Sequence, residues 1–102
     1  MAYIKSIYIK AKLLCNSQAE QFFRFPINNA VRISIWEKGA KYSAPSGISS
    51  VLPININSAA EVNIEFLLNY FNWRVSIWDE FVIGTFPVVI GEVKVLEVID
   101  GN

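Results

Sequence analysis

The stretch EVNIEFLL, residues 61–68, decides the fold class of this 102-residue chain. Its branched and aromatic side chains fall at every second position, and polar side chains lie between them; the apolar positions are Val62, Ile64, Phe66 and Leu68. Period-two alternation places one set of side chains on a core and the other in solvent, which predicts a β-strand. A helix that begins near Ser58, with Glu61 in a capping box, is the competing interpretation. Four alternating apolar positions fit a helix poorly.

The same alternation recurs on both sides of this stretch. Apolar runs occupy 7–13, 23–27, 31–36, 52–56, 73–77, 88–90 and 93–98, and clusters of Asn, Ser, Gly and Pro separate them. We expect the longest loop between Ala40 and Ser50, around Pro45-Ser46-Gly47. The run at 93–98 is apolar on both faces, which predicts a central strand or one covered by a partner. The pattern predicts one all-β domain over residues 1–102, an antiparallel two-sheet β-sandwich of about seven to eight strands.

Composition restricts the function. A chain with 53% apolar and 18% charged residues is not a disordered tail. It has no histidine and a single cysteine, Cys15, so Cys/His zinc sites and histidine-dependent nucleophilic catalysis are excluded. Cys15 is expected to be a buried, inert thiol. We predict no catalytic residue, no metal site, no cofactor and no enzyme activity.

The net charge is zero, which argues against a nucleic-acid partner. The charges are nevertheless divided: seven basic and two acidic residues up to Ser50 give +5, and two basic and seven acidic residues from Val51 give −5. Two interpretations remain open. The two halves neutralise one another across neighbouring strands, or the molecule is dipolar and stacks head to tail with copies of itself.

Nothing in the sequence predicts export or membrane insertion. The first residues lack the apolar core of a secretory signal, and no apolar run approaches the length of a transmembrane segment. A cytoplasmic location is the resulting expectation.

Two seven-residue segments resemble each other: VRISIWE at 31–37 and WRVSIWD at 73–79. On a strand, each would place Arg, Ser and Trp on one face and three bulky apolar residues, including Ile35 or Ile77, on the core face. A tryptophan on a polar face needs cover, which comes from a loop of the same chain or from a partner. Exposed aromatic rings beside arginine are typical of interface hot spots. The candidate interface residues are therefore Trp36, Trp78, Arg32, Arg74, Phe81 and Phe86.

The stretch from Val75 to Val95, with Trp78-Asp79 and Ile90-Gly91, resembles the closing strands of the lipid-binding β-sandwich family named after the second conserved region of protein kinase C. The acidic residues that members of the family carry in the following loop are replaced here by residues such as Phe81 and Phe86. Calcium needs six to eight oxygen ligands, and Asp79 and Glu80 are the only acids near this loop. The resemblance therefore implies a calcium-independent member that binds proteins or serves in assembly.

A non-catalytic module for protein–protein interaction or self-association is the leading functional prediction. Two alternatives remain. A peripheral lipid binder would insert the apolar segment 81–86 into a bilayer, although no polybasic patch adjoins it. A carbohydrate binder would stack sugar rings on aromatic side chains and bind them through amides; these residues are Trp36, Trp78, Tyr70, Asn63, Asn69 and Asn72.

Overall fold

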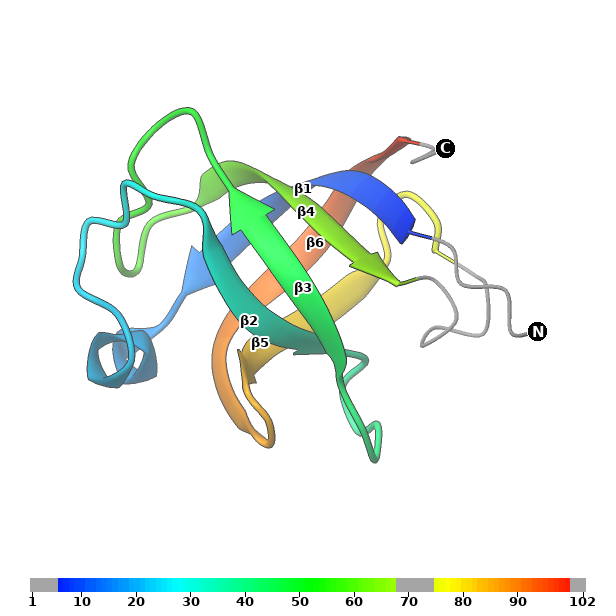
Figure 1. The fold of residues 1–102 in the computed structure, drawn as a ribbon, viewed down its shortest axis with the longest axis horizontal. Helices are drawn as coiled ribbons and strands as arrows, with labels where there is room; N and C mark the ends of the chain where they lie inside the picture. Colours follow the sequence, from blue (N-terminus) through cyan, green and yellow to red (C-terminus); the bar gives the residue numbers. More distant parts are fainter. Residues whose placement is uncertain (1–5, 68–74, 100–102) are drawn as a thin grey trace.

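The computed structural model describes residues 6–67 and 75–99. In these parts of the chain, six strands form one antiparallel sheet that closes on itself (Figure 1). The strands are β1 (Ser6–Cys15), β2 (Val31–Trp36), β3 (Ala44–Ser49), β4 (Ala60–Leu67), β5 (Glu80–Thr85) and β6 (Val88–Ile99), and a 3-10 helix, η1 (Ser17–Gln21), follows β1. Around the barrel the order is β1-β4-β3-β2-β5-β6.

The fold is all-β, but the predicted two-sheet sandwich of seven to eight strands is wrong. β1 pairs with β4 on one edge and with β6 on the other, so that Tyr8 lies opposite both Glu65 and Ile99. Alternation assigns each strand an inner and an outer face, but it does not say whether the inner faces belong to two facing sheets or to one curved sheet. The sequence pattern alone could not separate these architectures.

The inner faces of the strands form the core. β1 contributes Ile7, Ile9, Ala11 and Leu13, none more than 6% exposed. The predicted strand at 61–68 is confirmed as β4 in its described part, and Leu68 lies outside the described residues. The helix expected to compete from Ser58 does not form. The two runs at 88–90 and 93–98 belong to one strand, β6, which lies between β1 and β5.

The predicted loop at 40–50 is wrong, because it contains β3. The sequence did not predict β3 because most of its residues are small and one is a proline. Ser46 is its buried polar residue, and its hydroxyl donates a 2.6 Å hydrogen bond to the Ile33 carbonyl oxygen. This bond satisfies the hydroxyl inside the barrel wall. Pro45 lies opposite Ser34 of β2, just outside the segment 46–49 that pairs with β4.

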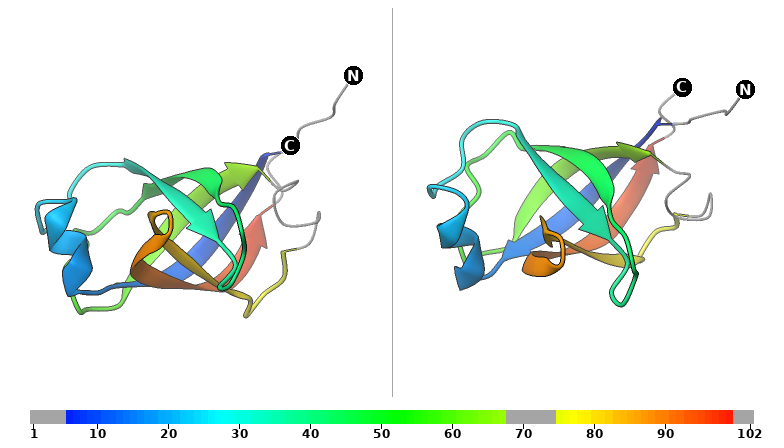
Figure 2. Two further views of the ribbon diagram at one scale, coloured as in Figure 1. Left: turned by 90° about the horizontal axis from the view of Figure 1, so that it is seen from below. Right: turned by 60° about the horizontal axis from the view of Figure 1, so that its bottom comes forward.

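The runs at 23–27 and 52–56 are not strands, contrary to prediction. They meet at one point, where Ile27 and Ile54 exchange two backbone hydrogen bonds of 2.9 and 3.0 Å. Both side chains join the core, as does Ala19 of η1. Figure 2 shows η1 at one end of the barrel, away from the start of β1 and the end of β6. These segments close that end of the core.

The strand predicted at 73–77 is also wrong in its described part. Residues 76–79 form a turn: the Asp79 amide donates to the Ser76 carbonyl at 3.1 Å, and the Asp79 carboxylate accepts from the Ser76 amide at 2.7 Å. Ile77 is consequently 51% exposed and does not join the core. Aspartate and serine side chains favour such turns because they bond to nearby backbone.

The divided charges are interleaved in space. The register places Lys12 of β1 between Glu61 of β4 and Lys94 of β6. Lys10 Nζ lies 3.6 Å from Glu61 Oε1, and Lys94 Nζ lies 3.8 Å from Glu80 Oε1. The Lys10–Glu61 pair joins the basic half of the chain to the acidic half, as the interpretation of neutralisation across strands expects, whereas Lys94 and Glu80 both belong to the second half. Because their side chains are exposed, they contribute little to stability. Among the described residues, no helix is long and apolar enough to cross a membrane.

Candidate binding groove on the barrel wall

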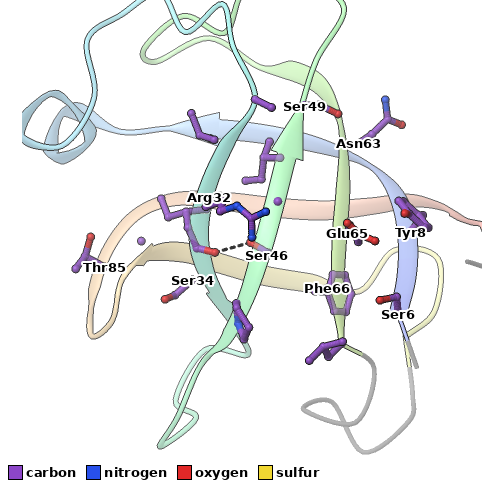
Figure 3. Close-up of a pocket in the computed structure, with 18 of the residues that line it drawn as sticks. Ser6, Tyr8, Arg32, Ser34, Ser46, Ser49, Asn63, Glu65, Phe66 and Thr85 are labelled. Atoms are coloured by element: carbon purple, nitrogen blue, oxygen red, sulfur yellow. Dashed lines mark hydrogen bonds between the residues drawn. The ribbon is translucent and has the colours of Figure 1, made fainter. Parts of the chain in front are cut away.

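A groove of about 800 Å³ runs over the outer face of the wall formed by β1, β4, β3 and β2. We call it the β3 groove, because β3 lies at its centre (Figure 3). Its polar rim and walls come from different strands; they include Tyr8, Arg32, Ser49, Asn63, Glu65 and Thr85. The groove is therefore built by pairing between distant parts of the sequence.

The centre of the β3 groove is a row of four residues on neighbouring strands. Register places Arg32 opposite Gly47, Gly47 opposite Glu65, and Glu65 opposite Tyr8. A Cβ atom added at Gly47 would meet no heavy atom within 4 Å. The missing side chain leaves a depression between a cationic and an anionic residue, which lie about 10 Å apart at two strand spacings.

The two ends of this row differ in charge and in hydrogen bonding. Glu65, which lies opposite Tyr8, raises the pKa of the Tyr8 hydroxyl above its ordinary value, first as a hydrogen-bond acceptor for the protonated form and then through its negative charge. Arg32 is exposed and forms no ion pair with any described residue. The groove thus has at one end a guanidinium with no ion pair among the described residues, and at the other a carboxylate beside the Tyr8 hydroxyl.

β2 has different neighbours along its two edges. It pairs with β3 over Val31–Ile35, but with β5 only over Ser34–Trp36. The register of β5 and β6 shifts between Ile83 and Gly84, where a Cβ atom on Gly84 would collide with the Val88 carbonyl oxygen. The β3 groove extends into this region, where Gly84 and Thr85 line it.

Trp36, a predicted interface residue, is covered by its own chain. It is only 5% exposed, and its ring centroid lies 5.0 Å from that of Phe86 in an edge-to-face arrangement with an interplanar angle of 84°. It lies opposite Val82 of β5, and neither residue belongs to the core cluster. Together with half-buried Phe86 they form a small apolar cluster on the outside of the barrel. Of the two sources of cover expected from the sequence, the structure has the loop of the same chain.

Phe81 is buried as well. It belongs to the core, 3% exposed, with its ring 6.3 Å from that of Phe66. The segment 81–86, which the lipid-binding alternative would insert into a bilayer, is mostly β5 and mostly buried. Phe81 therefore offers no accessible surface to a partner or a membrane.

Trp78 is exposed, but it lies outside the β3 groove. Its side chain is 63% exposed, its φ is +74°, and its amide donates a 2.8 Å hydrogen bond to Val95 of β6. Arg74, Tyr70, Asn69 and Asn72 lie outside the described residues. Of the interface residues predicted from the sequence, the described structure brings only Arg32 into the groove.

No motif in the sequence marks Tyr8, Gly47 or Glu65 as site residues. Alternation does place Tyr8 and Glu65 on outward faces, and Asn63 was considered for sugar binding. No sequence signal places these side chains together, because Gly47, which links them, lies in the segment interpreted as a loop. The row depends on β3 and on its register.

The acidic residues near the region that resembles a calcium loop have partners in the fold. The Asp79 carboxylate accepts from the Ser76 amide, and Glu80 pairs with Lys94. Within the described ranges, no group of three or more His, Cys, Asp or Glu residues could hold a metal ion. Burial raises the pKa of the Cys15 thiol, which favours its unreactive protonated form. The β3 groove places a cationic and an anionic side chain, Arg32 and Glu65, on either side of Gly47.

No protein-family model matches this sequence, and no curated protein is significantly similar to it.

Proposed function

We propose that this protein is a non-catalytic protein-binding module whose β3 groove receives a partner. One observation carries the proposal: Arg32, Gly47, Glu65 and Tyr8 form a row across four strands, with opposite charges on either side of a depression. Arginine and tyrosine are enriched among residues that dominate binding energy at protein interfaces. Fixed charges of opposite sign also favour one orientation of a partner over others.

The two alternatives have less support. A lipid binder depended on the apolar segment 81–86, and most of this segment is buried in the barrel wall. Of the residues predicted for a carbohydrate binder, Asn63 lines the groove and Trp78 is exposed outside it, but Trp36 is buried beneath Phe86. A protein partner fits the charged row better than an uncharged sugar, because an uncharged ligand would desolvate Arg32 without pairing it.

The proposal is tested by photo-crosslinking in cells that make the protein. A benzophenone amino acid replaces Ser49 in the groove or, as a matched control, Glu92 on the outer face of β6. We expect a discrete protein adduct from position 49 and none from position 92. Adducts with protein from position 92 alone, or only glycan or lipid adducts from position 49, would contradict the proposal.

A second variant blocks the groove. Gly47→Trp fills the depression without meeting other atoms at the Cβ position. We expect the adduct from position 49 to disappear and the melting temperature to stay within a few degrees of the wild-type value. Glu92→Trp, which adds the same ring elsewhere, should leave the adduct unchanged. Sedimentation of the purified protein shows whether the partner is a second copy.

A further inference from the structure

We infer that the partner enters as an extended segment that adds to the free half of β2 and places an acidic side chain opposite Arg32. This inference rests on the proposed function, and it names the binding mode and the chemistry of the ligand. Strand addition joins an extended peptide to an unpaired sheet edge through backbone hydrogen bonds, and alternate side chains give specificity.

The direction of the β2 peptide groups follows from Pro45. Proline has no N–H, so the Ser34–Pro45 pair must be a non-hydrogen-bonded position of the β2–β3 ladder. Its neighbour Ile33 is then a hydrogen-bonded position, and its carbonyl points toward β3. The 2.6 Å bond from Ser46 Oγ to the Ile33 carbonyl oxygen agrees with that direction. The peptide groups of Ser34 and Arg32 consequently point to the other edge of β2.

On that other edge, Ser34 and Arg32 have different surroundings. Ser34 lies opposite Gly84 of β5, whereas Arg32 lies beyond the last β2–β5 pair. No described residue is paired with Arg32 on this side, and Arg32 is exposed. The Arg32 N–H and carbonyl therefore form a short edge of the sheet that has no backbone partner among the described residues.

Two features of the structure separate β5 from β2 beyond the Ser34–Gly84 pair. The register shift at Gly84 turns the β5–β6 hairpin, and the edge-to-face contact between Phe86 and Trp36 holds its tip. The β3 groove continues into the space beside β2, where it is lined by both Arg32 and Thr85 (Figure 3). An incoming strand would therefore have room beside Arg32.

The side chains of β2 define the chemistry of this strand. A residue paired directly with Arg32 projects its side chain to the same face, about 5 Å away. A carboxylate there would meet the Arg32 guanidinium, which forms no ion pair with any described residue. The residues on either side of it would face the barrel wall beside Val31 and Ile33, which are half-buried and pack against the core. The expected ligand is an extended segment with the order apolar, acidic, apolar.

The free edge is tested first, on the unliganded full chain, by amide hydrogen exchange measured by NMR. We expect the Arg32 amide to exchange about a hundred times faster than the Ser34 amide, because only Ser34 has a paired residue, Gly84, on β5. Similar protection of the two amides would overturn the inference.

The ligand is then sought with a phage-displayed library of random peptides of about twelve residues, selected on the immobilised full chain. We expect enrichment of the apolar-acidic-apolar order and, on binding of a selected peptide, slowing of Arg32 amide exchange by about tenfold or more. Arg32→Glu should weaken that peptide by about tenfold, and a lysine in place of the peptide's acidic residue should restore binding to this variant. Failure to enrich any peptide, enrichment without an acidic residue, or no restoration by lysine would overturn the inference.

One outcome separates this inference from the proposed function. A selected peptide that shifts the Gly47 and Glu65 resonances and is lost in Gly47→Trp, but leaves Arg32 amide exchange unchanged, would bind the groove without adding a strand. This result would support binding of a partner in the β3 groove and would contradict the addition of a strand to β2. Protein adducts from position 92 alone would instead remove the groove proposal itself.

Discussion

Two segments of similar sequence have different secondary structures in the described parts of this protein. VRISIWE at 31–37 includes β2, with Ile35 fully buried and Trp36 5% exposed. WRVSIWD at 73–79 is described from Val75, and there it becomes a turn, with Ile77 51% and Trp78 63% exposed. The shared Ser-Ile-Trp order therefore does not decide the conformation of either segment.

The neighbours of each segment account for the difference. β2 has β3 on one edge and Val82 of β5 opposite Trp36 on the other, so its backbone and both faces are covered at this end. In the second segment, the Asp79 side chain bonds to the Ser76 amide and Trp78 takes a positive φ. A local side-chain bond competes with the ladder and ends the alternation. The comparison shows that a short strand pattern needs partners on its edges to become a strand.

The largest expected difference is between the two tryptophans. Trp36→Ala should lower the free energy of unfolding by about 3 to 5 kcal/mol, because it empties the space between Val82 and Phe86. Trp78→Ala should change it by less than about 0.5 kcal/mol, since the ring is mostly in solvent. Urea unfolding followed by circular dichroism measures both. Equal losses in the two variants would contradict the assignment of cover to Phe86.

The same comparison can be made with the isoleucines of the two segments, Ile35 and Ile77. Ile35→Ala should cost about 2 to 5 kcal/mol, and Ile77→Ala less than about 0.5 kcal/mol, because only Ile35 belongs to the core. Calorimetric melting of both variants under one buffer condition gives the difference. A loss of several kcal/mol in Ile77→Ala would mean that this segment pairs as a strand after all.

The smallest effect concerns the backbone of Trp78. A φ of +74° is unfavourable for any residue with a Cβ atom, and glycine is free of this cost. Trp78→Gly should therefore be more stable than Trp78→Ala by about 0.5 to 1 kcal/mol. Chemical denaturation of this pair isolates the backbone contribution, because neither variant carries the ring. If the alanine variant proved the more stable, the turn would have a different conformation in solution.

How much of the fold was predictable depends on the strand. The long alternating runs of β1 and β4 were predicted because each has a continuous apolar face, and Ile35 was placed correctly in the core. β6 was predicted as two separate runs, 88–90 and 93–98. β3 was not, because Ala44, Pro45 and Gly47 have the composition of a loop and gain their strand conformation from pairing with β2 and β4. Closure of the barrel was beyond the sequence, because it depends on register around the whole sheet rather than on any strand.

The candidate site was less predictable than the fold. Arg32 was selected for its neighbour Trp36, yet in the structure it belongs with Gly47, Glu65 and Tyr8 of other strands. Phe81 was interpreted as a loop residue because the resemblance to the lipid-binding family places a loop after Asp79, but the chain forms β5 there and turns only after it. A site assembled from single residues on four strands leaves no local spacing that a sequence analysis can detect.

The position of β1 between β4 and β6 also has a consequence for how the chain acquires its structure. On the ribosome, β1 emerges first, but Tyr8 cannot meet Ile99 until β6 has been synthesised. Such distant pairing makes folding late and slow, and it leaves one side of β1 open to other nascent chains in the meantime. Lys10 and Lys12 lie on β1, and charged lysines on an unpaired strand disfavour pairing with strands of other chains. Lys10 and Lys12 lie beside acidic residues in the folded barrel, and they would also reduce aggregation of the chain before β6 has been synthesised.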